Sequence, residues 1–256
     1  MTSTMLRMQH TSLQYSDSPA QQRQDINDLF EQGKDFPIKT GTEGASDKGS
    51  DNMNHPFLLE FAKQYNHAIH IVRDNWVAID RAIIEPKSLS KGELFLISND
   101  NMVGNGHDRV LSFMEFDHID ERVGHLSVGA IHYATKSRGP SWPNWDINEV
   151  CAKKLSGWMA KEGAGKNLAF LNGDFNMSDK DPKQDWAFGG NFTSMADELK
   201  AWQNTGHGPI DGFCSYDRDA RVKAKRFNVL DDKEMFQHSD HFVCRGTWEI
   251  QHLKTA

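Results

Sequence analysis

The chain has 256 residues, of which 38% are hydrophobic and 25% charged, with 20 Gly and 8 Pro. These proportions exclude a collagenous, low-complexity or wholly disordered chain. No apolar run approaches the roughly 20 residues of a membrane-spanning helix, and the first residues lack the apolar stretch of a secretory signal. We therefore expect a cytoplasmic protein without a membrane span.

The net charge is −7, from 29 Lys and Arg against 36 Asp and Glu. An acidic chain of this kind has no global attraction for a polyanion, so any contact with phosphate depends on local positive charge or on a bound metal ion. The cysteines Cys151, Cys214 and Cys244 are odd in number and widely spaced, and no CxxC occurs. This pattern predicts reduced, buried thiols rather than a disulfide framework.

In the N-terminal half, a strand is predicted over LRMQHTSLQY and a helix over residues 21–33, where Ile26, Leu29 and Phe30 share one face. A short strand then leads into a Gly-flanked turn at TGTEGA. A polar loop follows over residues 44–56 and a helix over 57–67. Branched and alternating residues next predict strands in the following ranges: 67–79, 81–86, 93–98, 109–118 and 124–134.

In the C-terminal half, helical spacing predicts helices over residues 147–162 and 193–203. Strands are predicted over 167–175, 208–216 and 241–250. Helices and strands thus alternate irregularly, and no linker divides the chain. We expect a single α/β domain over residues 1–256, with two mixed β-sheets packed face to face and flanked by helices.

The segment FLNGDFN becomes polar abruptly after an apolar run. Asp174 and Asn176 lie two residues apart, on one face if the strand continues. A carboxylate can orient a water molecule, and an amide can donate to a phosphoryl oxygen. Gly173 permits close approach of backbone or ligand. The alternative is a turn in which these side chains bond their own backbone.

The segment HSDHFV places Asp240 beside His241, and histidine is the natural general base near neutral pH. Such a base needs a carboxylate to fix its tautomer, and Asp211 in GPIDGF is a candidate. A solvated surface cluster is the alternative. Zinc on His238 and His241 is a further one, which is disfavoured because no Cys or third His lies nearby at ligand spacing.

Two more polar residues stand out upstream. Glu43 lies in TGTEGA, where a carboxylate could bind a hard cation such as Mg²⁺ or Mn²⁺ or could serve only the turn. His132 ends the apolar run GAIH, where a polar ring needs a partner. A hydrogen-bonded core histidine remains the alternative for this residue. Because strand ends can converge on one rim of a sheet sandwich, these polar residues are candidates for one site.

In this order, GDFN, IDGF and SDHFV, with a strand-borne His and a Glu upstream, resemble the endonuclease/exonuclease/phosphatase family. The resemblance spans nearly the whole chain. It implies a four-layer α/β sandwich with the active site at one rim.

The resemblance also implies roles for individual residues. Glu43 and Asp240 would bind metal, and Asp211 would pair with the catalytic base His241. His132 would contact the scissile phosphate, Asp174 would orient the attacking water, and Asn176 would hold a phosphate oxygen. Arg109, in GHDRVLSF, is either a phosphate clamp or a solvated surface arginine.

The chain departs from the family pattern near its first strand. The family carries Asn near the end of that strand, where this chain has Ser12, with Gln14 two residues beyond. The family's Gln-Glu pair is Thr42-Glu43 here. The departure bears on the metal-binding half of the site.

Together these features predict a divalent-metal-dependent phosphodiesterase, a nuclease that hydrolyses DNA or RNA as a monomer with Mg²⁺ or Mn²⁺. The tryptophans of RGPSWPNW (138–145) could stack on bases or form a core flap. Lys136, Arg138 and the basic run 218–227 offer local positive charge, unless they belong to solvated loops. The alternatives are a phosphatase or phospholipase of the same fold, and a binding module without catalysis.

Overall fold

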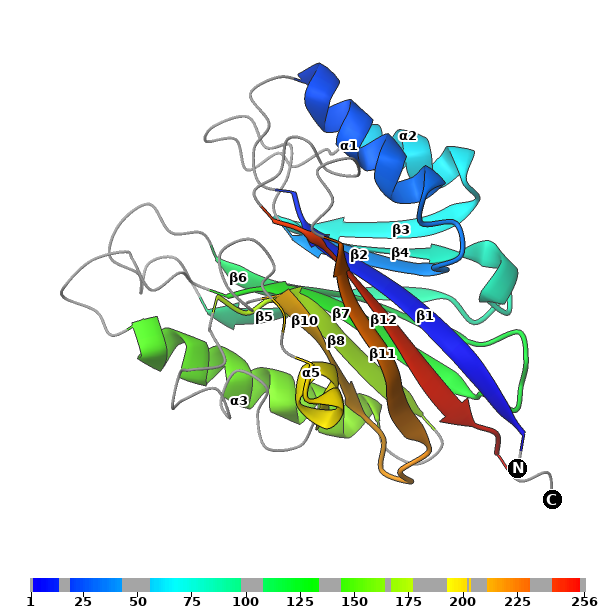
Figure 1. Ribbon diagram of the computed structural model, residues 1–256. Helices are drawn as coiled ribbons and strands as arrows, with labels where there is room; N and C mark the ends of the chain where they lie inside the picture. Colours follow the sequence, from blue (N-terminus) through cyan, green and yellow to red (C-terminus); the bar gives the residue numbers. More distant parts are fainter. Residues whose placement is uncertain are drawn as a thin grey trace.

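Two six-stranded β-sheets packed face to face form the centre of the protein (Figure 1). The computed structural model describes these residues: 2–13, 19–42, 56–97, 108–133, 144–163, 167–176, 193–201, 203, 211–230 and 241–253, with the backbone alone for 144–149. Helices cover the outer faces of both sheets. The predicted fold class, a four-layer α/β sandwich with two mixed sheets, is confirmed.

The first sheet has the strand order β11-β12-β1-β2-β4-β3. Its strands are β1 (Ser3–Ser12), β2 (Ile38–Thr42), β3 (His67–Val72), β4 (Asn75–Asp80), β11 (Val222–Leu230) and β12 (Val243–Gln251). β1 and β2 are parallel, whereas the other neighbours are antiparallel. The first and last strands of the chain therefore pair with each other, and the two termini lie side by side (Figure 1).

The second sheet has the strand order β5-β6-β7-β8-β10-β9. Its strands are β5 (Ser90–Ile97), β6 (Arg109–Asp117), β7 (His125–His132), β8 (Leu168–Asp174), β9 (Thr193–Ser194) and β10 (Asp211–Tyr216). Here β7 and β8 are the parallel pair. Each sheet is thus antiparallel except for one parallel pair near its middle.

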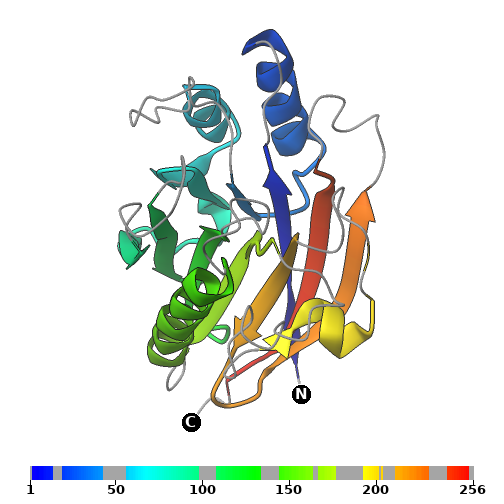
Figure 2. The same ribbon diagram turned by 90° about the vertical axis from the view of Figure 1, so that its left-hand side faces the viewer.

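The helices α1 (Pro19–Glu31) and α2 (Pro56–Gln64) cover the first sheet, and α3 (Asn144–Glu162) covers the second (Figures 1 and 2). Ile26, Leu29 and Phe30 of α1 are fully buried, as their predicted common face requires. α5 (Met195–Leu199) packs against β10 and β11, and a 3₁₀ turn, η1 (Arg81–Ile83), follows β4.

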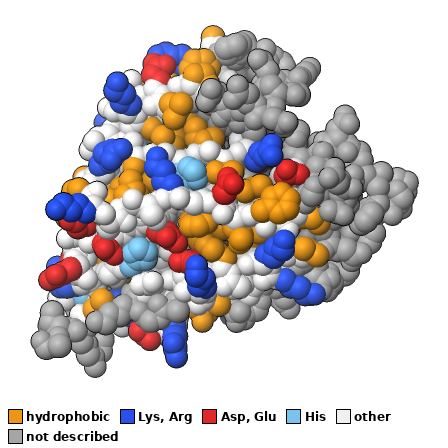
Figure 3. Space-filling model, turned by 180° about the vertical axis from the view of Figure 1, so that it is seen from behind, with side chains coloured by type: hydrophobic (Ala, Val, Ile, Leu, Met, Phe, Trp, Pro, Cys, Tyr) orange, Lys and Arg blue, Asp and Glu red, His pale blue; other side chains and the backbone are white. Residues whose placement is uncertain are grey.

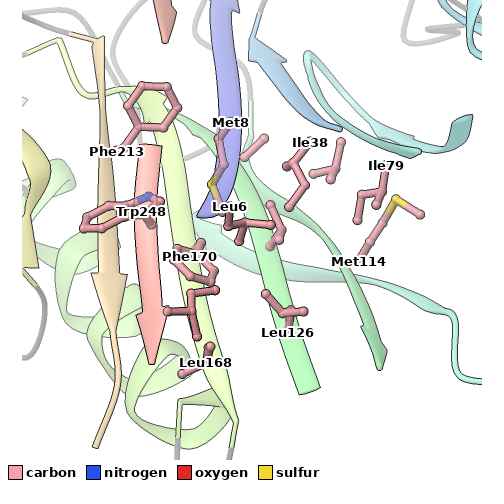
Figure 4. Packing of buried hydrophobic residues seen from close by; sticks show 14 of the residues in the cluster. Leu6, Met8, Ile38, Ile79, Met114, Leu126, Leu168, Phe170, Phe213 and Trp248 are labelled. Atoms are coloured by element: carbon pink, nitrogen blue, oxygen red, sulfur yellow. The ribbon is translucent and has the colours of Figure 1, made fainter. Parts of the chain in front are cut away.

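The main hydrophobic core lies between the two sheets (Figure 4). Trp248 of β12 and Phe170 of β8 meet there with ring centroids 5.9 Å apart, and both are fully buried. Leu6 and Met8 of β1 face the same interior. Burial of each such side chain stabilises the folded state by about 1.5–3 kcal/mol relative to exposure. This layer therefore holds the two sheets together.

The strand predicted over residues 67–79 is a β-hairpin rather than one strand. β3 and β4 are joined by a turn at Arg73 and Asp74, in which Arg73 adopts a φ of 55°. A strand predicted over 81–86 is also wrong. These residues form η1, capped by the Asp80 carboxylate, followed by an isolated bridge at Ile84.

One further prediction fails in the C-terminal half, and one alternative is excluded there. The helix predicted over 193–203 is only α5, because Lys200 turns to a φ of 51° and ends it. The basic run 218–227 is not a solvated loop, since most of it forms β11. Ala224 and Phe227 of β11 point into the core.

The predicted state of the cysteines is confirmed, because all three are free and buried. No helix in the described part of the chain is long and apolar enough to cross a bilayer. The predicted loop 44–56 lies outside the described residues, apart from Pro56.

Paired glycines on β8 and β10 provide a matched test of the packing. A Cβ on Gly173 would lie 2.4 Å from the Ile131 carbonyl oxygen, whereas a Cβ on Gly212, its partner across the strands, would meet nothing closer than 4.0 Å. We expect Gly173→Ala to lower the free energy of unfolding by about 1–3 kcal/mol because β7 and β8 must separate. Gly212→Ala changes it by less than about 0.5 kcal/mol. Urea unfolding of both variants checks this, and equal effects would contradict it.

Candidate active site

Strand ends bring the polar residues together at one rim of the sandwich. In the second sheet, β7 ends at His132, β8 ends at Asp174 and β10 begins at Asp211, and the strand register sets these residues side by side. In the first sheet, β1 and β2 end at Ser12 and Thr42, and His241 lies two residues before β12 begins. Strands that run toward the rim end there and their antiparallel neighbours begin there, which gathers side chains distant in the sequence.

Asp174 stands between two histidines at the centre of this rim. Its Oδ2 lies 3.7 Å from His132 Nε2 and 3.9 Å from His241 Nε2. All three side chains are buried. Two imidazole nitrogens, one at the end of β7 and one just before β12, thus face the same carboxylate oxygen.

His241 is oriented by Asp211, as a histidine base requires. Its Nδ1 lies 2.9 Å from Asp211 Oδ2. Burial acts to raise the pKa of Asp211, but its contacts with His10 and His241 outweigh burial and hold the pKa well below the ordinary value. The carboxylate is therefore ionised and accepts the proton of Nδ1–H. Nε2 is left to take or give a proton on the side of Asp174.

His132 forms a second pair of the same kind, with a residue that the sequence did not single out. Its Nδ1 lies 2.8 Å from Asp74 Oδ2, and Arg109 Nη1 lies 3.8 Å from the same oxygen. Burial acts to raise the pKa of Asp74, but His132 and then Arg109 lower it to about 2. His132 is thus a buried, hydrogen-bonded histidine whose Nε2 faces Asp174.

The sequence does not reveal Asp74, because the pattern over residues 67–79 predicts one strand. In fact it lies in the turn between β3 and β4, directly before Asn75. The polar run Arg73-Asp74-Asn75 between two apolar stretches was the available signal for a turn. Nothing local indicated that this turn reaches the rim.

Asn176 forms the turn that the sequence left open as an alternative. Its backbone N–H donates to Asp174 Oδ1 at 2.9 Å, which is the Asx turn, and its φ is 49°. Its side-chain Nδ2 donates to the Tyr133 carbonyl at 2.8 Å. The turn occupies Oδ1 of Asp174 and leaves Oδ2 to the two histidines, so the turn itself aims the carboxylate.

Arg109 is not a solvated surface residue. It begins β6, is 5% exposed and lies beside Asp74. Its Nε is buried with no hydrogen-bond acceptor among the described residues. The guanidinium therefore places positive charge at the edge of the site.

The basic run is arranged away from this rim. Arg221 is buried and donates to the Val123 carbonyl at 3.1 Å, and Lys225 Nζ lies 3.0 Å from Glu249 Oε2. β11 reaches the rim only at Leu230, which pairs with Val243. Arg221 therefore lies directly before β11, and Lys225 lies in the half of that strand away from the rim.

Several predicted residues lie outside the described part of the chain. These are Glu43, Asp240, Gln14, His238, Lys136, Arg138 and the side chains of Trp142 and Trp145. Ser12, which stands where the resemblance places an Asn, ends β1 and is fully buried.

One group of described residues could hold a metal ion. Asp174, Asp211 and His241 each offer a ligand atom, and these atoms lie within 4.8 Å of one another. Carboxylate oxygens with one imidazole suit a divalent cation. The donor chemistry of the rim thus fits a divalent metal ion.

The fold matches solved structures of endonuclease/exonuclease/phosphatase proteins. One from Bacteroides thetaiotaomicron superposes with a TM-score of 0.70 at 16% identity, covering 100% of this chain and 99% of that one. A mannosyl-6-phosphatase from the same organism gives 0.68 at 15% identity, over 97% of this chain and 100% of that one. The catalytic domain of human Nocturnin with bound sulfate gives 0.72 at 10% identity, over 97% and 98%.

No family model and no curated protein matches the sequence. The structural matches establish that the protein has the fold of the endonuclease/exonuclease/phosphatase proteins, as its resemblance implied. Proteins with this fold include a phosphatase.

The contact between Asp74 and His132 predicts how the stability of the protein depends on pH through the Asp74 carboxyl group. Its pKa falls from the ordinary 3.8 to about 2 on folding, so its stabilising contribution is full above pH 4 and is lost as the pH falls toward 2. We expect the free energy of unfolding to drop between pH 5 and pH 2.5 by about 2 kcal/mol more in the wild type than in Asp74→Asn.

Urea unfolding at both pH values measures this difference. Asp117→Asn is the matched control, because Asp117 also accepts from a histidine, His125, but its side chain is 59% exposed. It should keep the wild-type pH dependence. The prediction would be contradicted if the free energy of unfolding of Asp74→Asn fell as much between pH 5 and pH 2.5 as that of the wild type.

Proposed function

We propose that the protein is a divalent-metal-dependent phosphodiesterase, a nuclease that hydrolyses DNA or RNA by in-line attack of an activated water. The observation that carries the proposal is the geometry around Asp174. Two histidines, each held by its own carboxylate at Nδ1, present Nε2 to the same oxygen of Asp174. Each ring can therefore exchange a proton only at Nε2, which faces Asp174, where substrate would bind.

The paired histidines can divide acid and base work. Neutral His241 takes a proton from a water held by Asp174, and Asp211 stabilises the imidazolium that forms. Protonated His132 donates Nε2–H to a phosphate oxygen, with Asp74 balancing its charge. His241 thus supplies the base, and His132 supplies a hydrogen-bond donor to the same substrate.

The charge of the rim supports a requirement for metal. Among the described side chains, the carboxylates Asp74, Asp174 and Asp211 face a single permanent cation, Arg109. A phosphodiester anion would be repelled by this set. When bound, a divalent cation supplies the positive charge that neutralises the phosphate oxygens. Asp174 would hold it, together with Glu43 and Asp240, while the hydrogen bond to Asp211 keeps His241 as the base.

A phosphatase acting on a small phosphoester is the second candidate, and two observations favour it. The basic run 218–227, which was expected to offer positive charge to nucleic acid, is partly buried or paired away from the rim. On the described part of the face in Figure 3, acidic, basic and apolar side chains are interspersed and do not form an extended positive patch on that face. A mannosyl-6-phosphatase shares the fold.

An activity assay tests the proposal and separates the candidates. Plasmid DNA, single-stranded DNA and RNA oligonucleotides and a sugar phosphate are each incubated with Mg²⁺, with Mn²⁺ or with EDTA. We expect cleavage of nucleic acid that EDTA abolishes. His241→Ala should lower kcat by about 10²- to 10⁴-fold through loss of the general base.

His125→Ala is the matched control, because His125 also pairs with an aspartate but lies at the opposite end of β7 from His132. It should keep wild-type activity. Phosphate release from the sugar phosphate without nucleic acid cleavage would establish the phosphatase instead. Binding of nucleic acid without turnover under any metal would reduce the protein to a binding module.

A further inference from the structure

We propose that His10 is a positioning residue, which holds Asp211 from the interior so that a His10–Asp211–His241 chain orients the general base. The inference rests on the proposed function for its consequence in catalysis. His10 lies on β1 and was not a candidate in the sequence, where it is one polar residue among several in LRMQHTS.

The two oxygens of Asp211 face two different histidines. Oδ2 accepts from His241 Nδ1 at 2.9 Å, and Oδ1 lies 3.6 Å from His10 Nε2. His10 belongs to the first sheet and Asp211 to the second, so the contact crosses the sandwich. The side chains of His10 and Asp211 are both fully buried. Asp211 is thus held between the substrate side and the interior.

The opposite edge of the His10 ring has a defined partner. His10 Nδ1 lies 3.0 Å from Thr40 Oγ1, and Asn172 Nδ2 donates to the same hydroxyl oxygen at 3.1 Å. Thr40 has one hydroxyl proton, and His10 Nδ1 is nearer than the other acceptor, the Gln9 carbonyl at 3.4 Å. The hydroxyl therefore donates to Nδ1.

This assignment fixes the tautomer of His10. With Nδ1 accepting, the ring proton is on Nε2 and points toward the Asp211 carboxylate. The reverse tautomer would set a lone pair against that anion. Asn172 then donates to Thr40 and Thr40 to His10, whose Nε2–H points toward Asp211 Oδ1. Asp211 also accepts from His241 Nδ1–H through its other oxygen.

The position of His10 argues against a role in packing alone. Leu6 and Met8, which precede it on the same face of β1, are apolar core residues, as Figure 4 shows. The next residue on this face is a fully buried histidine, edge-on to Phe213 with ring centroids 6.5 Å apart. A buried polar ring costs free energy that an aliphatic side chain would not. It stands where the core meets the rim, next to the carboxylate of the base.

Without the Nε2–H group of His10, Asp211 loses the donor that faces Oδ1. The carboxylate is then held less firmly about its χ2 torsion, and its hydrogen bond to His241 Nδ1 is less well directed. The consequence is a less defined His241 ring, not a weaker affinity for substrate. The effect therefore falls on kcat rather than on KM.

Three substitutions separate this role from packing. His10→Gln keeps an N–H at the place of Nε2, His10→Asn keeps one only at the place of Nδ1, and His10→Leu keeps neither. We expect kcat to fall by about 10- to 100-fold in His10→Leu and His10→Asn, as is typical when the partner of an oriented histidine is lost. KM changes less than about twofold, and His10→Gln retains most of the activity. Equal losses in His10→Gln and His10→Asn would overturn the proposal.

A spectroscopic measurement tests the positioning without any turnover. Long-range ¹H–¹⁵N NMR of the full-length protein reports the tautomer of the His241 ring, assigned with His241→Ala. The wild type and His10→Gln should show a single Nδ1–H form, whereas His10→Leu should show mixed or broadened ring signals. Unchanged His241 signals in a folded His10→Leu protein would overturn the proposal. If the wild type cleaves no phosphoester, the proposed function fails, and the NMR result still decides the role of His10.

Discussion

The site depends on the alignment of three strand ends in one sheet. β7 pairs in parallel with β8, and β8 pairs antiparallel with β10, so His132, Asp174 and Asp211 occupy one row. A slip of one residue in either pairing would turn a member of this row to the opposite face. Gly173 permits the close approach of β7 to β8 that this register needs, because a Cβ there would strike the Ile131 backbone. The chemistry at the rim is therefore set by backbone pairing before any side chain interacts.

Buried charge at this rim is tolerated because each group has partners. Asp74 is held by His132 and Arg109, and Asp211 by His241 and His10. Ion pairs taken out of water are costly unless they are hydrogen-bonded on several sides. The arrangement gives up some stability for side chains that are held in place, which is what the proposed catalysis would require. The apolar layer below it, around Trp248 and Phe170, supplies the stability that the rim lacks.

The sequence supports the fold class well, because long apolar strands and amphipathic helices carry strong periodic signals. It also identified residues that the structure brings together, namely His132, Asp174, Asp211 and His241. Each of these follows or precedes an apolar run, where a polar residue stands out. The failures were local. β11 was hidden because exposed lysines and arginines on its outer face conceal the inward Ala224 and Phe227.

Taken by itself, the sequence determined which chemical groups are available, their order along the chain, and the strands that would carry most of them. The tertiary structure alone decided that Asp74 orients His132, that Arg109 is buried, and that His10 reaches Asp211 from the other sheet. These contacts join residues distant in the chain through the packing of two sheets. No periodicity or spacing encodes them, because hydrophobic patterns report which side of a strand is buried and not what lies opposite.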